Sequence, residues 1–164
     1  MFEIRRYSPA DKPLWDKYVA KARNATFLFF RDYMDYHGDR FEDHSLLFFV
    51  GYHLHSILPA NIVGTTLYSH QGLTYGGLLM DNEVTSAEVI HLFEDLNHYL
   101  RQCGIQNVVY KPVPWVYHQL PSEEDLYPLF WICKARLITR DIGTVIFIAR
   151  SEERRVGKEW RSRW

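Results

Sequence analysis

Apolar residues recur at helical spacing in two long stretches of the chain. The first stretch carries Leu14, Trp15, Tyr18, Val19 and Ala22. This spacing predicts a helix that ends near Ala22. The segment Ser8-Pro9-Ala10-Asp11 precedes it. A serine N-cap, a proline at the first helical position and an acid in the first turn are typical of a helix start.

The second stretch, Thr85 to Cys103, gives the clearest helical pattern. Its apolar stripe consists of Val89, Leu92, Phe93, Leu96, Leu100 and Cys103. Gly104 follows as a natural C-cap. Two shorter helices are predicted at Arg31 to Tyr36 and at Ser122 to Phe130, the latter with Ser122 as its cap.

Runs of β-branched, aromatic and other apolar residues predict strands between these helices. A first strand is expected at Phe2 to Tyr7. Three more runs, Ser45 to Val50, His53 to Ile62 and Thr65 to Ser69, are separated by the turn segments Gly51-Tyr52 and Val63-Gly64. These three runs indicate an antiparallel meander.

The remaining strand signals lie nearer the C-terminus. Ile105 to Lys111 has the pattern of a buried strand that Pro112 ends. A last pair of strands is expected at Arg136 to Asp141 and Thr144 to Ala149. The order of elements predicts an α/β (α+β) domain with a mixed, largely antiparallel sheet flanked by helices.

Composition adds little to this picture except by exclusion. The chain has 164 residues, is 47% hydrophobic, and carries 19 basic and 20 acidic residues, so its total charge points to no nucleic-acid or membrane partner. Cys103 and Cys133 do not form a disulfide framework, which favours a reducing compartment. The N-terminus has no apolar signal core, and no apolar run reaches the roughly 18 residues of a membrane helix. A cytoplasmic location is therefore expected.

The segment from Ser151 to Trp164 has neither strand nor helix periodicity. It contains five basic and three acidic residues. One interpretation is a basic arm for RNA or another anionic surface. The interpretation that we favour is an extension foreign to the fold, such as translated vector sequence. The chain is accordingly divided into a domain at residues 1–150 and a tail at residues 151–164.

The candidate chemistry gathers in one polar loop. The residues that offer hydrogen bonds or close backbone approach there are Ser69, His70, Gln71, Thr74, Tyr75, Gly76 and Gly77. Lys111 ends an apolar strand and has the charge to neutralise an anionic group. Tyr117 and His118 follow in a proline-flanked loop. For each of these positions a purely structural role remains open.

Other constellations carry less weight. Ser69 and His70 suggest a nucleophile and a base, but adjacent residues of a strand point to opposite faces. His53 and His55 share a strand face, and the residues His91, Glu94 and His98 share a helix face. Either group is a weak metal candidate, and no metal site is expected. The residues Trp15, Trp115 and Trp131 are expected to be core anchors.

Four segments of the chain resemble a bacterial group of GNAT-family acetyltransferases related to the Fem aminoacyltransferases. The segments are Thr26 to Met34, Leu58 to Asn61, Ser69 to Leu78 and Tyr110 to Pro114. The resemblance covers about residues 1–150. It implies a GNAT-like lobe, the N-terminal one of two such lobes in a chain of roughly twice this length.

In GNAT enzymes the donor's pyrophosphate is bound by an Arg/Gln-x-x-Gly-x-Gly/Ala loop that opens a helix. The most similar segment here, Arg101-Gln102-Cys103-Gly104-Ile105-Gln106, departs from that pattern at its last position. It is also expected at a helix C-terminus, where the dipole repels phosphate. No cofactor is therefore expected in this half. The complete enzyme would use acyl-CoA or aminoacyl-tRNA as its donor.

The resemblance implies an N-acyltransferase that moves an acyl or aminoacyl group to an amine. This half would bind the acceptor, an amine-bearing small molecule or a cell-wall precursor, and no catalytic residue is identified. The residues expected to do so are Ser69, His70, Gln71, Tyr75, Gly76, Gly77, Lys111 and Tyr117. The expected protein partner is a second GNAT-like lobe or another copy of the chain, and nucleic acid enters only if the donor is a tRNA. The alternative is a binding or pairing lobe without activity of its own.

Overall fold

The computed structural model of the chain describes residues 1–143 and 145. The predicted tail at residues 151–164 lies outside the described residues. So does the predicted strand from Thr144 to Ala149, apart from Val145.

The first of two sheets is fully antiparallel. Its strand order is β1 (Glu3–Arg6), β3 (Leu46–Val50), β4 (His53–Leu58) and β7 (Leu79–Met80). The turn between β3 and β4 is made by Gly51, whose φ of 59° is readily adopted only without a side chain.

The second sheet has the order β2 (Glu42–Asp43), β5 (Asn61–Val63), β6 (Thr66–Tyr68) and β8 (Asn107–Val109). β8 runs parallel to β6, while the other pairs are antiparallel. Helices and mostly antiparallel sheets together make an α+β fold, as the sequence predicts. The expectation of one sheet is wrong, because the strands divide into two.

The division between the sheets falls inside the run that is predicted to be one strand, His53 to Ile62. Pro59 and Ala60 separate β4 from β5, and proline has no N–H for a ladder bond. The bend is fixed by the two residues that connect β2 to β3, His44 and Ser45. Ala60 O accepts the backbone N–H of His44 at 2.9 Å, and its N–H donates to the Ser45 hydroxyl at 3.1 Å.

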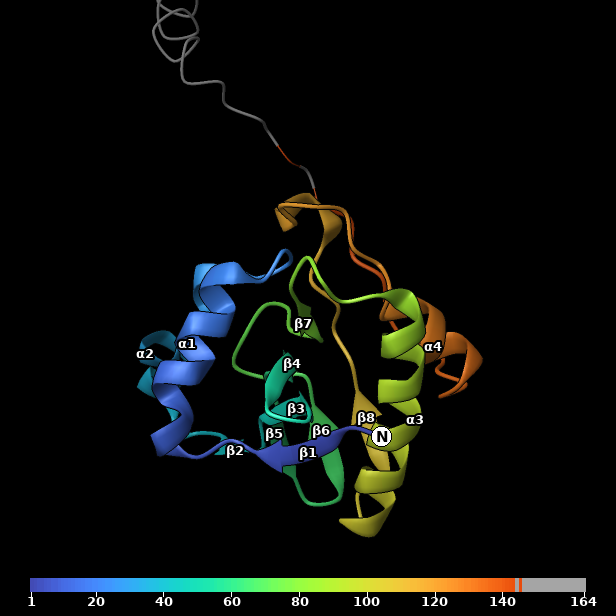
Figure 1. The fold of residues 1–164 in the computed structure, drawn as a ribbon, viewed down its shortest axis with the longest axis horizontal. Helices are drawn as coiled ribbons and strands as arrows, with labels where there is room; N and C mark the ends of the chain where they lie inside the picture. The colour runs from blue at the N-terminus through green and yellow to red at the C-terminus, as the bar shows by residue number, and fades with distance from the viewer. Residues whose placement is uncertain (144, 146–164) are drawn as a thin grey trace, which may run out of the picture.

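The N-terminal helices lie on one side of the strands (Figure 1). A 3-10 turn at Pro9–Asp11 leads into α1 (Lys12–Lys21), and the Ser8 N–H and hydroxyl both bond to the Asp11 carboxylate. The predicted end near Ala22 is thus confirmed, whereas the predicted cap Ser8 begins the 3-10 turn and the α-helix itself begins at Lys12. α2 (Arg31–Met34) follows after a 3-10 turn at Phe27–Phe29.

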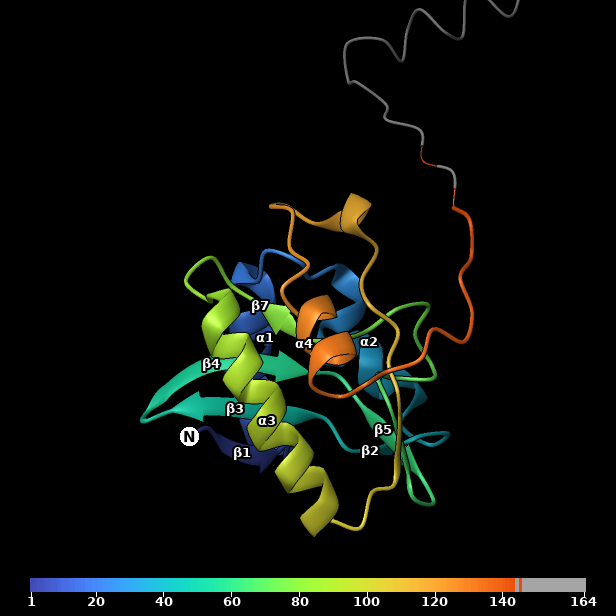
Figure 2. The same cartoon turned by 90° about the vertical axis from the view of Figure 1, so that its right-hand side faces the viewer.

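The long helix α3 (Ser86–Gln102) lies on the other side of the strands, together with α4 (Leu126–Trp131) (Figures 1 and 2). Thr85 and Glu88 form a capping box at the start of α3, and Gly104 has a φ of 72° just beyond its end. The predicted stripe is buried except for its last member. Cys103 is exposed, because the helix has ended before it.

Two apolar clusters fill the space on either side of the strands. One packs α1 against the first sheet and is centred on side chains such as Trp15, Phe29 and Ile57. The other joins the strands to α3 through residues that include Phe48 and Leu92. The strands β3, β4 and β7 are therefore buried almost throughout, as their mainly apolar sequences indicate, whereas the edge strand β1 is mostly exposed.

Several expectations for the C-terminal third are wrong. β8 is a short edge strand with mostly exposed side chains, although its sequence has the apolar pattern of a buried strand. α4 begins at Leu126, so Asp125 and not Ser122 is its N-cap. Arg136 to Asp141 forms no strand. Its side chains are all exposed, and the segment has no ladder partner among the described residues.

The three tryptophans have different environments. Trp15 is fully buried, and its indole N–H donates to Phe29 O at 2.8 Å. Trp115 and Trp131 are 67% and 64% exposed, so the expectation that they anchor the core is wrong. Within the described residues, none of the helices combines the length and the apolar character needed to cross a membrane.

Candidate functional site

The loop after β6 is closed at both ends against the end of β8. At its start, the Ser69 N–H donates to Val109 O at 2.9 Å, and the Ser69 hydroxyl accepts the Lys111 backbone N–H at 2.7 Å. At its end, the Gly76 N–H donates to Lys111 O at 2.8 Å. The loop Ser69 to Gly77 and Lys111 thus form one unit, termed here the loop bracket.

The side chain of Lys111 reaches the middle of the loop, at Leu73. Its ammonium group donates to Leu73 O at 2.5 Å. Burial lowers the pKa of this lysine from its ordinary value. The expectation that Lys111 and the loop lie together is confirmed, and the lysine also ties down the middle of the loop.

Two positions of the loop bracket require glycine, each for a different physical reason. A Cβ at Gly76 would lie 2.0 Å from Ser69 O, so no side chain fits where the two ends of the loop meet. Gly77 has a φ of 87°, and a Cβ there would lie 2.9 Å from the Tyr110 hydroxyl. Gly76 is therefore required by close backbone contact, and Gly77 by its positive φ.

Polar side chains in the first half of the loop are held by neighbours. The amide of Gln71 is joined to Asn61: the Asn61 side-chain N–H donates to Gln71 Oε1 at 2.8 Å, and the Gln71 backbone N–H donates to Asn61 Oδ1 at 2.7 Å. His70 has a φ of 64° and lies edge-on to Phe41, with ring centres 5.7 Å apart. Asn61 therefore fixes where the loop leaves the sheet.

Tyrosine rings form an aromatic wall beside the loop bracket. Tyr75 and Tyr117 stack with ring centres 5.1 Å apart. The Tyr75 hydroxyl donates to the Thr26 hydroxyl at 3.2 Å, and its ring meets Phe29 edge-on. Tyr117, carried by the 3-10 turn Trp115–Tyr117, is half exposed and presents the outer face of this stack.

A buried tyrosine and carboxylate connect the loop bracket to α4. The Tyr110 hydroxyl accepts the Leu78 N–H at 2.6 Å and donates to Asp125 Oδ2 at 2.5 Å. Burial raises the pKa of Asp125 to about 6, and burial beside Asp125 raises the pKa of Tyr110. Asp125 is not among the residues that the sequence singles out as site candidates. Its burial and its pairing with Tyr110 have no signal in the sequence pattern.

The structure brings all eight predicted site residues together, but it divides them into two groups. The buried group, which builds the loop, is Ser69, His70, Tyr75, Gly76 and Gly77. The group that reaches the surface is Gln71, Lys111 and Tyr117. Only the second group, with the exposed neighbour Thr74, is placed to touch a ligand directly.

The other sequence candidates lie elsewhere. His55 occupies a bulge, because Phe49 pairs with Leu54 and Phe48 pairs with Ser56. His91 bonds to Glu94 on the exposed face of α3 at 3.1 Å. Two shallow hollows of about 450 and 520 Å³ lie against α4 and are lined by none of the loop bracket.

The segment compared above with a phosphate-binding loop lies at the end of α3. The helix ends at Gln102, and Gly104 then adopts its positive φ. The free carbonyl groups of a helix C-terminus carry partial negative charge, which disfavours a pyrophosphate. The predicted position of this segment at a helix C-terminus is confirmed.

Comparison with known proteins gives no relative on which to base an assignment. No protein-family model matches the chain, and no curated protein matches it.

Proposed function

We propose that this chain is the acceptor-binding half of an N-acyltransferase of GNAT or Fem type. The reaction would transfer an acyl or aminoacyl group to an amine of a small molecule or a cell-wall precursor. The loop bracket would present its outward side chains to this acceptor.

The proposal is supported by one observation: the four segments that carry the GNAT resemblance contact one another in the fold. Tyr75 of the third segment bonds to Thr26 of the first and Gln71 bonds to Asn61 of the second. The Lys111 ammonium of the fourth segment bonds to Leu73 O of the third. Segments up to 85 residues apart in sequence thus share one hydrogen-bonded unit.

The surface of this unit suits a polar acceptor with some negative charge. Gln71 offers amide hydrogen bonds, Lys111 offers charge, and Tyr117 offers a ring face. The buried members of the loop bracket hold these groups in place. The reaction itself would be direct attack of the amine on a bound thioester or ester, in which positioning contributes much of the rate.

The donor would be held outside this surface. The string at the end of α3 lacks both the sequence and the helix end that bind a pyrophosphate. Acyl-CoA or aminoacyl-tRNA would therefore be bound by a second GNAT-like lobe.

The proposal is tested by an NMR titration of the ¹⁵N-labelled chain with a peptidoglycan stem peptide that has a free amine. Its N-acetylated form is the matched control, since it lacks only the acceptor amine. We expect amide signals at Gln71, Thr74 and Tyr117 to shift, with several-fold weaker binding of the acetylated peptide. Shifts confined to α4, or equal binding of the two peptides, would contradict an acceptor site at the loop bracket.

A second candidate function, a pairing lobe without activity, is favoured by the surface of α4. Tyr127, Phe130 and Trp131 are all more than half exposed on this short helix. Large exposed aromatic patches mark surfaces that associate. Light scattering of the wild type and of the Phe130→Ser variant distinguishes this function, which requires a concentration-dependent dimer that the substitution removes.

A further inference from the structure

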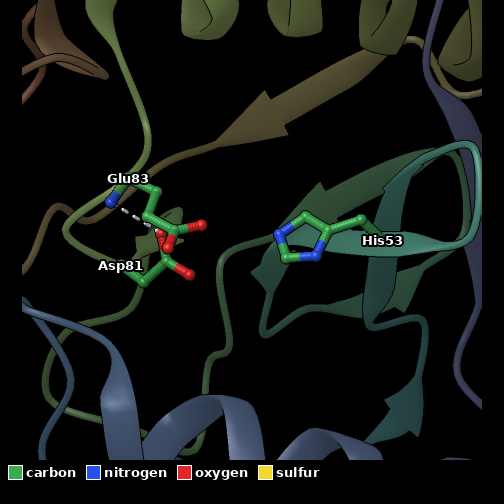
Figure 3. A group of neighbouring side chains, drawn as sticks. All are labelled: His53, Asp81 and Glu83. Carbon is green, nitrogen blue, oxygen red and sulfur yellow. Dashed lines mark hydrogen bonds between the residues drawn. The ribbon is translucent and has the colours of Figure 1, made fainter.

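A histidine and two carboxylates meet at the edge of the first sheet, away from the loop bracket. One ligand atom from each of His53, Asp81 and Glu83 lies within 4.8 Å of the others. Figure 3 shows the His53 imidazole directed toward the two carboxylates. The sequence pattern pairs His53 with His55 instead, because the pairing of β4 with β7 has no local signal.

Strand pairing brings these residues together. β4 begins at His53, and the chain reaches Asp81 directly after β7 ends at Met80. Because β4 and β7 are antiparallel, with Ser56 opposite Met80, the start of β4 lies beside the segment that follows β7. Two segments far apart in sequence therefore supply the three side chains.

Asp81 is fixed before any ligand arrives. It is 4% exposed, and its N–H donates to the Tyr18 hydroxyl at 3.1 Å. Asp81 Oδ1 accepts the Glu83 N–H at 3.1 Å, and Oδ2 accepts the Lys21 ammonium at 2.5 Å. Buried and hydrogen-bonded on both oxygens, this carboxylate has the rigidity of a preorganised ligand.

The other two side chains are available. Across the part of the chain that the structure describes, neither ring nitrogen of His53 has a hydrogen-bond partner, and the carboxylate of Glu83 has none either. Both residues are exposed and free to rotate. Asp81 and Glu83 carry two negative charges against the single positive charge of Lys21, which favours an added cation.

We propose that His53, Asp81 and Glu83 form a binding site for a divalent transition metal such as Zn²⁺. One imidazole nitrogen and two carboxylate oxygens suit Zn²⁺ and Co²⁺ better than Ca²⁺ or Mg²⁺, which prefer oxygen ligands alone. Donor atoms bound to one Zn²⁺ at roughly 2.0–2.2 Å lie at most about 4.4 Å apart. Rotation of the two exposed side chains closes the remaining gap, and water completes the shell.

Lys21 competes with the metal for Asp81. The ion pair between them would lengthen or break when a cation binds the same carboxylate. We therefore expect Lys21→Met to strengthen metal binding, because it removes the ammonium group and keeps the apolar stem. The site does not depend on the proposed acyltransferase function, because it shares no residue with the loop bracket.

The experiment is a calorimetric titration of the chelator-treated chain with Zn²⁺, and a parallel titration with Co²⁺ followed by visible absorption. We expect one saturable site. His53→Ala and Glu83→Gln should each weaken it at least roughly tenfold, since even residues behind the ligands contribute that much. Both substitutions lie at exposed positions, and circular dichroism checks that each variant is folded.

His91→Ala is the matched control, an exposed histidine beside a glutamate on α3. It should leave the affinity unchanged. The proposal is overturned if the wild type shows no saturable binding, if His53→Ala and Glu83→Gln both bind as the wild type does, or if Lys21→Met binds more weakly.

Discussion

At the scale of single residues, the loop bracket contains positions where the backbone is packed so closely that no side chain fits. Gly76 is the strictest of these, because its Cα faces Ser69 O at the neck of the loop. Glycine in this loop could be predicted from the sequence as a sign of close approach. The backbone atom that each glycine contacts could not be predicted, because these contacts depend on how β8, at residues 107–109, packs beside the loop.

We predict that Gly76→Ala destabilises the chain by more than about 2 kcal/mol, since the backbone must move to relieve the clash. Gly64→Ala is the control. Gly64 has a φ of 59° but open space around its Cα, so only the conformational cost of about 1 kcal/mol applies. Urea unfolding of both variants measures the difference. Equal losses of stability would mean that the backbone at Ser69 and Gly76 moves apart at little cost.

Asp125 gives a pH dependence with a definite sign. Its pKa is about 6 in the folded chain because of burial, against an ordinary value of 3.8. Between these values the folded chain binds more protons than the unfolded chain, so the free energy of unfolding falls as pH rises. The gap corresponds to about 3 kcal/mol, lost between roughly pH 4 and pH 6 and constant above.

We predict that Asp125→Asn removes this loss. The amide keeps an acceptor for the Tyr110 hydroxyl but carries no charge to bury. Urea unfolding at pH 4.5 and pH 7 compares the two chains. The free energy of unfolding of the variant, relative to that of the wild type, should increase as pH rises. Parallel stability profiles would show that Asp125 titrates at its ordinary value.

At the scale of elements, the helices could be predicted because their signals are local. Ser8 and Asp11, or Thr85 and Glu88, lie within one turn of each other and act on nearby backbone groups. The strands were predicted less well, because pairing is decided by distant partners. The run His53 to Ile62 has one continuous apolar pattern, yet its two halves pair in different sheets.

The C-terminal elements show the same limit. Arg136 to Asp141 has strand composition, but it finds no ladder partner among the described residues. α4 packs against α3, and its N-cap Asp125 accepts a hydrogen bond from the Tyr110 hydroxyl that the sequence pattern does not predict. This contact joins α4, the end of β8 and the loop at Leu78.

We predict that Tyr110→Phe loosens this junction. The substitution leaves the buried Asp125 carboxylate and the Leu78 N–H without their partner, which costs about 2–3 kcal/mol. Tyr127→Phe is the control, since Tyr127 is exposed and stacks on Trp131 through its ring alone. Thermal unfolding should separate the two variants. Equal melting temperatures would show that Tyr110 contributes no more than a surface hydroxyl.

At the scale of the whole molecule, the two helical layers enclose the strands and leave the loop bracket at one end of the sheets. The residues of the candidate site could be named from the sequence, because all of them except Tyr117 lie in the segments that carry the resemblance. Its division into buried and outward groups could not be predicted. That division depends on the Asn61, Thr26 and Tyr117 contacts, which join separate parts of the chain.

We predict that the chain alone does not bind acetyl-CoA tightly. The segment compared with a phosphate loop, Arg101 to Gln106, lies at the C-terminal end of α3, where the helix dipole opposes a pyrophosphate. Calorimetry should show a dissociation constant weaker than about 10 μM, which is about −7 kcal/mol. Tighter binding would reveal a donor site on this chain and would contradict an acceptor-only role.

The central claim is that the outward face of the loop bracket, and not α4, binds the amine acceptor. The most direct measurement is the affinity of the stem peptide for Lys111→Met, with Trp131→Ser as the control on α4. Lys111→Met keeps the apolar stem and removes the charge. We predict a loss of roughly tenfold or about 1.4 kcal/mol in Lys111→Met and no change in Trp131→Ser. Unchanged affinity in Lys111→Met, together with lost affinity in Trp131→Ser, would contradict the account.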